Sequence, residues 1–262
     1  MNAVVLNSAV NSTGRILGPA LAGWVIELTG IGPALYFNAS CYLVATLCLL
    51  FIKGVSQGKM AGGTAMLQDL LVGLRYFWAS PVAFTVIGIG FAFGFFGMPY
   101  AQVMPAFAKE VLGVGAAGAG LLITAVGVGS LVGNVVLASA GNFRHKHWLL
   151  LGSILLFGVG LLLFALSPWY WVSWVLLLLV GMGSMVPMGT TVLQLTTPPE
   201  VQGRILSLWY VSAGLMSIGA LPMALVAEAV GWPVAIGGGA AIYLLVALYL
   251  GLWRPTLRHL RV

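Results

Sequence analysis

The chain has 262 residues, of which 61% are hydrophobic and only 6% are charged. A water-soluble domain of this length needs far more polar surface, so the composition excludes a soluble globular protein and predicts a chain that lies largely in lipid. The formal net charge of +6 does not indicate a nucleic-acid partner, because the basic residues occur in short clusters between apolar runs.

Eight apolar runs in the sequence are long enough to cross a bilayer, for which about 20 residues are needed. Backbone groups in lipid must be hydrogen-bonded internally, so runs of this length are expected to be helices. The predicted fold is therefore an all-α polytopic membrane protein. Its predicted spans cover residues 4–28, 33–52, 82–108, 115–140, 148–166, 171–196, 205–230 and 233–253.

The first predicted span carries polar side chains within an otherwise apolar run. Asn7, Asn11 and Arg15 recur at a spacing of four and share one stripe of the helix with small residues. A guanidinium about 16 Å along the helix costs at least about 2.5–3.5 kcal/mol in lipid, so it needs a water-filled cavity or a partner. We expect these three residues to line a substrate pathway. In the alternative interpretation Arg15 only pins neighbouring helices, or its side chain reaches back to the cytoplasmic interface.

The second span and the linker after it carry two further patterns. Cys41 and Cys48 lie seven residues apart on one helix face, which suits neither a disulfide nor a metal cage, so we expect them to be buried and inert. In the linker, residues 53–81, apolar residues recur at helical spacing opposite Asp69 and Arg75. This pattern predicts an amphipathic helix lying along the membrane surface.

The third to eighth spans contain polar, aromatic and methionine side chains that could wall a cavity. We expect the third, fourth, sixth and seventh spans to form its walls. The candidate pathway residues there are Tyr100, Gln102, Asn134, Met185, Gln194 and Trp209. Soft and aromatic linings suit bulky amphiphilic molecules, although each of these residues also fits an ordinary helix core.

These spans carry no signature of catalysis or of a bound cofactor. There is no His-Glu-x-x-His, no Gly-x-Ser-x-Gly and no pair of intramembrane aspartates, so we expect no catalytic residue, no metal and no cofactor. No Asp or Glu lies deep within the third to eighth spans. A carboxylate that couples transport to protons would therefore have to lie elsewhere.

The connections between spans differ in charge. One side carries only Lys109. The other side carries Lys53, Lys59, Arg75, Arg144, Lys146, Arg204, Arg254, Arg258 and Arg261. The excess of positive charge on one side predicts that this side, and with it both chain termini, is cytoplasmic.

An internal repeat appears when the sequence is compared with itself at an offset of 201 residues. The aligned pairs include Gly18 with Gly219, Glu27 with Glu228 and Gly30 with Gly231. Both copies cross the membrane in the same sense, which is typical of transporters built from two six-helix halves. We therefore expect three parts: residues 1–52 as the last two helices of an N-terminal bundle, 53–81 as a cytoplasmic linker, and 82–262 as a complete C-terminal six-helix bundle. On this interpretation four helices of the first half are absent.

Several motifs carry a resemblance to a known family. Gly14-x-x-x-Gly18-Pro19-x-x-Ala22-Gly23 resembles the fifth-helix antiporter motif of the major facilitator superfamily, with Ala22 in place of the usual glycine. Its small residues would allow a second helix to approach closely. Three further segments are similar to one branch of that superfamily, the bacterial drug and siderophore exporters of the macrolide and enterobactin type. They are Asn7-Ser8, Gly73-Leu74-Arg75-Tyr76 and Pro199-Glu200-x-x-Gly203-Arg204-Ile205.

The resemblance implies a major facilitator-type bundle in a bacterial inner membrane. It implies export of a small molecule by alternating access, with protons as a possible coupling ion, the lipid bilayer as surroundings and no nucleic acid as partner. It also implies that the first four helices are missing, and we expect the chain by itself not to transport. The alternative is an inactive truncated remnant or a non-transporting membrane subunit.

Overall fold

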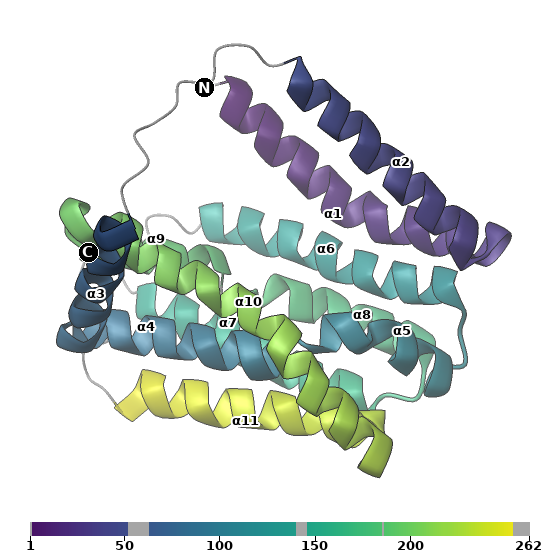
Figure 1. Cartoon of the computed structure of the whole chain (residues 1–262). Coiled ribbons are helices and arrows are strands. Elements are labelled where there is room, and N and C mark those ends of the chain that lie inside the picture. Colours follow the sequence, from purple (N-terminus) through teal and green to yellow (C-terminus); the bar gives the residue numbers. More distant parts are fainter. Residues whose placement is uncertain (1, 52–62, 140–145, 185, 254–262) are drawn as a thin grey trace.

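The computed structural model describes residues 2–51, 63–139, 146–184 and 186–253, and within these ranges the chain is helical without strands (Figure 1). Eleven α-helices and one π-helical turn, η1, follow one another in this part of the chain. They are α1 (Asn2–Thr29), α2 (Ile31–Leu50), α3 (Gly63–Ala79), α4 (Pro81–Ala92), η1 (Phe93–Gly97), α5 (Tyr100–Glu110), α6 (Ala116–Ser139), α7 (Lys146–Leu166), α8 (Tyr170–Met182), α9 (Val186–Thr196), α10 (Pro199–Val230) and α11 (Trp232–Trp253).

The observed helices confirm the all-α polytopic membrane fold. Among the described residues, seven helical segments are long and apolar enough to cross a bilayer, and Ile16–Thr29 adds a shorter apolar helix. The predicted third span is α4, η1 and α5 in succession, and the predicted sixth span is α8 followed by α9. Hydrophobic run length located these spans well, but it did not show that two of them are interrupted.

Single glycines join two pairs of antiparallel helices. Gly30 links α1 to α2 with φ 84°, and Gly231 links α10 to α11 with φ 92°. Each glycine donates its N–H to the carbonyl four residues earlier, Ile26 at 2.9 Å and Ala227 at 2.8 Å. A positive φ favours glycine, and the offset of 201 aligns these two positions, so the repeat seen in the sequence has a counterpart in the two hairpins.

The buried core lies among α4 to α11. Phe93, Phe157 and Tyr243 meet at its centre, with ring centroids 4.8 Å apart for Phe93 and Phe157 and 5.5 Å apart for Phe157 and Tyr243. At one end, Trp232 Nε1 donates to Glu110 Oε2 at 2.7 Å and connects α11 to α5. The helices α4 to α11, which make up six of the apolar spans, form one continuous packed body, here called the six-helix unit.

Helices α1 and α2 lie on one side of that body (Figure 1). α1 packs against α6, while α2 packs against α1 and has no buried residue. Cys41 and Cys48 are therefore exposed, and the expectation that they are buried is wrong. Their apolar surroundings had suggested a core position, but α2 presents most of its surface outwards.

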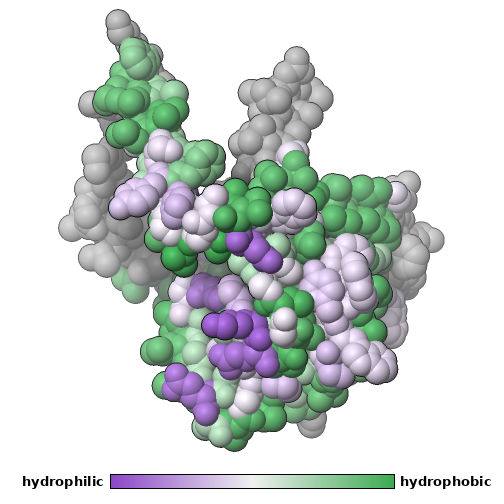
Figure 2. All heavy atoms as spheres, turned by 90° about the vertical axis from the view of Figure 1, so that its right-hand side faces the viewer, coloured by the Kyte–Doolittle hydropathy of each residue, from purple (hydrophilic) through white to green (hydrophobic). Residues whose placement is uncertain are grey.

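The two ends of the bundle carry different residues. α1 begins and α11 ends at the same end of the molecule, and α3 lies across the start of α10 there (Figure 1). At this end Tyr76 Oη donates to the Thr196 carbonyl at 3.5 Å. The opposite end holds Glu27, Glu110 and Glu228 at the termini of α1, α5 and α10. Figure 2 views the molecule from that opposite end and shows hydrophilic residues gathered there among hydrophobic ones.

Candidate functional site

Helices α1 and α6 touch at one end and separate towards the other (Figure 1). An added Cβ at Gly23 would lie 2.5 Å from the Ala116 carbonyl oxygen, so the two backbones are in direct contact there. Further along, Thr124 Oγ1 donates to the Ile16 carbonyl at 2.9 Å. A Cβ at Gly14 would meet nothing within 4 Å. We call the contact around Gly23 the closed end and the region around Gly14 the open end.

A cavity of about 630 Å³ lies between α1 and the six-helix unit. This volume falls within the range of about 300–1,000 Å³ found for small-molecule sites. The lining residues come from α1, the α4–η1–α5 segment, α6, α7 and the α8–α9 segment. They are Gly14, Pro19, Phe93, Met98, Tyr100, Ala101, Ile123, Val126, Gly127, Asn134, Phe157, Val180, Gly181, Ser184, Val186 and Pro187.

The cavity wall is mainly apolar and aromatic. Among the lining residues that the structure describes, Tyr100, Asn134 and Ser184 have side chains with hydrogen-bonding groups, and none is charged. Tyr100 is 3% exposed and its ring packs edge-on against Phe157, with centroids 6.1 Å apart. Such a wall can enclose a bulky apolar body and offer it a few hydrogen bonds, which is the ordinary composition of a small-molecule site.

The π-helical turn η1 positions part of this wall. The N–H of Met98 donates to the Phe93 carbonyl at 2.8 Å, a bond that spans five residues. The turn is held by close backbone contacts, since a Cβ at Gly94 would overlap the Ser212 carbonyl of α10. Interruptions of this kind are frequent at functional sites. The turn was not predicted, and its signal in the sequence is the density of glycine and proline in residues 94–99.

The structure brings four of the predicted residues together at the cavity. Gly14 and Pro19 line it from α1, Tyr100 from α5 and Asn134 from α6. Gly23 lies buried at the closed end, and its contact with Ala116 agrees with a helix-packing role. Of the glycines in the predicted antiporter motif, Gly14 and Gly18 have no described neighbour within 4 Å of an added Cβ.

Three predicted pathway residues lie away from this cavity. Gln102 Nε2 donates to Ser217 Oγ at 3.0 Å and thereby connects α5 to α10. Gln194 is exposed, and its carbonyl accepts a bond from Gln202 Nε2 at 3.0 Å. Trp209 is 3% exposed and wedged between two glycines of neighbouring helices. α10, the predicted seventh span, contributes no lining residue to the cavity.

The remaining predicted residues stay predictions. Asn7, Asn11 and Arg15 belong to α1, but their side chains lie outside the described part of the structure. Met185 lies outside the described residues altogether, between two residues that line the cavity. In the part of the chain that the structure describes, no group of three or more His, Cys, Asp or Glu could hold a metal ion.

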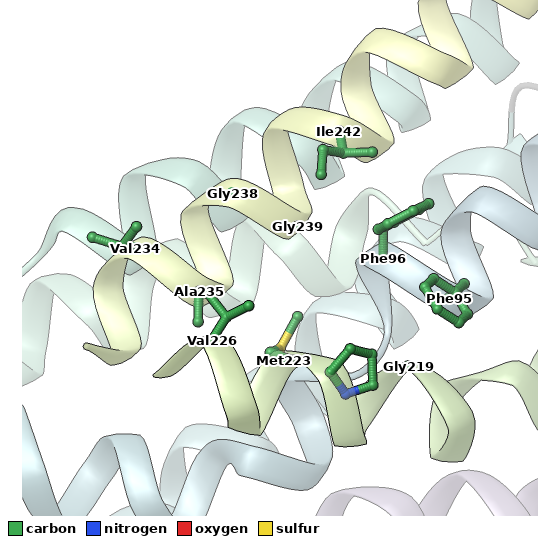
Figure 3. Close-up of a pocket in the computed structure, with 11 residues that line it drawn as sticks. Phe95, Phe96, Gly219, Met223, Val226, Val234, Ala235, Gly238, Gly239 and Ile242 are labelled. Carbon is green, nitrogen blue, oxygen red and sulfur yellow. The ribbon is translucent and has the colours of Figure 1, made fainter. Parts of the chain in front are cut away.

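A second, smaller hollow of about 170 Å³ lies between η1, α10 and α11 (Figure 3). Phe95 and Phe96 approach it from η1, Met223 from α10 and Ile242 from α11. All its lining side chains are apolar, and several of them are also exposed on the outer surface of the bundle. Without a polar group to orient a ligand, this hollow offers little specificity.

Comparison with known proteins gives two matches. The family model described as transmembrane secretion effector matches residues 1–259. The multidrug efflux pump Tap of Mycolicibacterium fortuitum is 26% identical over 226 residues, which cover 82% of this chain and 55% of that protein. The chain thus spans about half the length of this curated relative. Both matches point to a transporter rather than an enzyme.

Proposed function

Because the chain belongs to the transmembrane secretion effector family of major facilitator superfamily transporters, we propose that it exports a bulky amphiphilic small molecule by alternating access. The substrate class is drug-like or siderophore-like. The observation that carries the proposal is the cavity of about 630 Å³, with its apolar and aromatic wall and its few hydrogen-bonding groups. The name of the relative, a multidrug efflux pump, supports the same substrate class.

The proposed orientation places both chain termini in the cytoplasm of a bacterial cell and the spans in its inner membrane. Arg75 and Arg204 lie at the end of the bundle where α1 begins, whereas Glu27, Glu110 and Glu228 lie at the opposite end. Positively charged connections favour the cytoplasmic side. In this orientation the cavity is open towards the cytoplasm, and the contact of α1 with α6 closes it towards the outside.

We also propose that the chain contains two unequal parts of a two-half transporter. α1 and α2 would be the last two helices of one half, and α4 to α11 would form the other half, joined by the linker with α3. The matching turns at Gly30 and Gly231 support this division. Transport then depends on four further helices that complete the first half and the cavity wall.

Proton coupling is the proposed energy source, as in an antiporter. No Asp, Glu, His, Lys or Arg is among the cavity-lining residues that the structure describes. A coupling carboxylate would therefore act from outside this wall, within the helices that complete the first half.

An efflux assay in cells that express the parent protein, with the helices that complete its first half, tests the proposal. The assay uses a panel of macrolides, siderophores and dyes, with and without a protonophore. We expect Asn134→Ala and Tyr100→Ala to reduce efflux of an accepted compound about tenfold, because each removes a cavity group that binds or shapes the site. Ser139→Ala is the matched control, because Ser139 lies on the same helix as Asn134 and, in the part of the chain that the structure describes, its hydroxyl donates to the Val135 carbonyl of its own turn.

Three outcomes separate the alternatives. Efflux that is equal in the parent and in both cavity variants would contradict the role of this cavity. Transport by the purified chain alone in liposomes would contradict the need for further helices but support export. A stable, folded chain that moves none of the compounds in any setting would favour a non-transporting membrane subunit.

A further inference from the structure

The closed end contains a polar contact that the packing of small residues does not require. Glu27, in the last turn of α1, accepts a hydrogen bond from the backbone N–H of Ala117 at 2.8 Å. Ala117 is the second residue of α6, so its N–H is among those that have no partner within the helix. The negative carboxylate also faces the positive end of the α6 dipole. One side chain of α1 thus caps a different helix.

The surroundings of Glu27 leave it little room. A Cβ at Gly115 would lie 2.7 Å from Glu27 Oε2, so a side chain at this position would displace the carboxylate. One turn earlier on α1, Gly23 touches the Ala116 carbonyl, and the Pro19 carbonyl touches Gly120. These contacts hold the two helices together over the same stretch in which the carboxylate binds. The cap therefore exists only while the closed end is in contact.

We infer that Glu27 is a positioning residue that holds the closed end shut and so sets the balance between the two openings of the cavity. The inference rests on the proposed alternating access. In that cycle α1 and α6 must separate at the closed end and approach each other at the open end. Separation breaks this hydrogen bond and exposes the Ala117 N–H and the Glu27 carboxylate to water. The contacts at Gly23 and Gly120, in contrast, are apolar or backbone contacts.

The inference predicts a shift of population rather than a general loosening of the protein. Loss of a charge-assisted bond at a partly exposed helix terminus should change the ratio of the two openings by roughly threefold to tenfold. The cavity should become more accessible from the Glu27 side and less accessible from the opposite side. Each molecule is open on one side at a time, so molecules that open on the Glu27 side are lost from the population that is open on the other side. A merely destabilised structure would become more accessible from both sides.

Thiol labelling measures both accessibilities. The background carries Cys41→Ser and Cys48→Ser, and the probe is Ala101→Cys, a half-buried position in the cavity wall on α5. A membrane-impermeant maleimide is applied separately to each face of sealed vesicles that contain the full chain. Labelling is normalised to the protein that reacts after denaturation. It needs no substrate and no transport.

We compare Glu27→Ala, Glu27→Gln and Glu228→Ala. Glu228 is the residue that the repeat aligns with Glu27, and in the described part of the chain its exposed carboxylate forms no hydrogen bond. We expect Glu27→Ala to label roughly threefold to tenfold faster from the Glu27 face and correspondingly more slowly from the other face. Glu27→Gln keeps an acceptor and should fall between Glu27→Ala and the parent, and Glu228→Ala should label as the parent does.

Unchanged labelling of Glu27→Ala from both faces would overturn the inference. Faster labelling from both faces, or an equal effect of Glu228→Ala, would overturn it too, because neither is a shift specific to the closed end. Failure of the proposed export has a different signature, namely absence of efflux in the parent while the reciprocal shift in labelling persists.

Discussion

Trp209 is a residue whose chemistry suggested one role and whose surroundings give it another. Its residue type and its span made it a candidate for the substrate pathway, although both also fit an ordinary helix core. In the structure its indole fills the space left by Gly90 on α4 and Gly189 on α9 and is only 3% exposed. The glycines were visible in the sequence, but their pairing with Trp209 depends on how three helices meet.

The packing of Trp209 leads to the first prediction at this scale. Trp209→Ala should lower the free energy of unfolding by on the order of 2 kcal/mol, because it leaves a cavity between α4, α9 and α10. This is less than the ~3–5 kcal/mol typical of the cores of soluble proteins. When the helices separate, the apolar surface of the tryptophan is exposed to lipid rather than to water. The thermal melting temperature of the purified protein in detergent measures the effect.

Tyr210→Ala is the matched control for Trp209→Ala. Tyr210 is the next residue of α10 and is 62% exposed, so its truncation removes little packing. A melting temperature as low for Tyr210→Ala as for Trp209→Ala would contradict the core position of the tryptophan. A pathway role would instead appear as altered substrate preference with unchanged melting.

Other side chains show which residues of the cavity could be predicted from the sequence. Tyr100 and Asn134 were predicted from residue type within the right spans, and both line the cavity. Gln102 shares those properties, yet it faces Ser217 and α10. Residue type and position in a span indicate that a polar side chain lies within the membrane and forms hydrogen bonds there. Whether it faces the cavity or another helix depends on the rotation of its helix about the helix axis.

At the scale of elements, hydrophobic runs predicted the spans but not the interruptions in the third and sixth spans, and α10 begins at Pro199, six residues before its predicted start. A π-helical turn forms where one extra residue is accommodated in a helix. In η1 it is stabilised from outside, by the contacts of Gly94 with α10 and of Gly219 with the Phe95 carbonyl. Such contacts join residues more than a hundred positions apart, so no local pattern could reveal them.

The same contacts support a prediction about η1. Gly94→Ala should destabilise the protein by about 1–3 kcal/mol, because the new methyl group would overlap the Ser212 carbonyl and force η1 away from α10. Since η1 also supplies Phe93 to the cavity, we expect a loss of efflux together with a lower melting temperature. Efflux is measured in cells, and the melting temperature is measured on protein purified from the same cells.

Gly152→Ala provides the matched control for Gly94→Ala. Gly152 is exposed within α7, and a Cβ there would meet nothing within 4 Å. Alanine favours helix by up to about 1 kcal/mol over glycine, so this variant should melt at the same or a slightly higher temperature. Equal melting of Gly94→Ala and the parent would mean that the close approach of η1 to α10 is not required.

At the scale of the whole molecule, the arrangement of α1 against α6 determines where the cavity opens. The glycines of α1 predicted a close helix contact, but they did not show that Gly23 would be in contact while Gly14 would be free. That difference depends on the angle between two helices from distant parts of the chain. Because of this angle, the same run of small residues has a closed end and an open end. The side of the membrane that the open end faces is the side from which a substrate can enter the cavity.

The orientation in the membrane gives the last prediction, and two positions at opposite ends of α10 can measure it. Glu200 is exposed in the first turn of α10, and Val230 is its last residue and 55% exposed. The 32 residues of this helix rise about 48 Å, so its two ends lie on opposite sides of a bilayer core of roughly 30 Å.

With both native cysteines replaced by serine, Val230→Cys should react with an impermeant maleimide in intact spheroplasts. Glu200→Cys should react only after permeabilisation, because the basic connections hold its side of the bundle in the cytoplasm. The reverse pattern would place the open end of the cavity outside the cell, so that in this conformation the protein would accept its substrate from the outside and export would lose its structural basis.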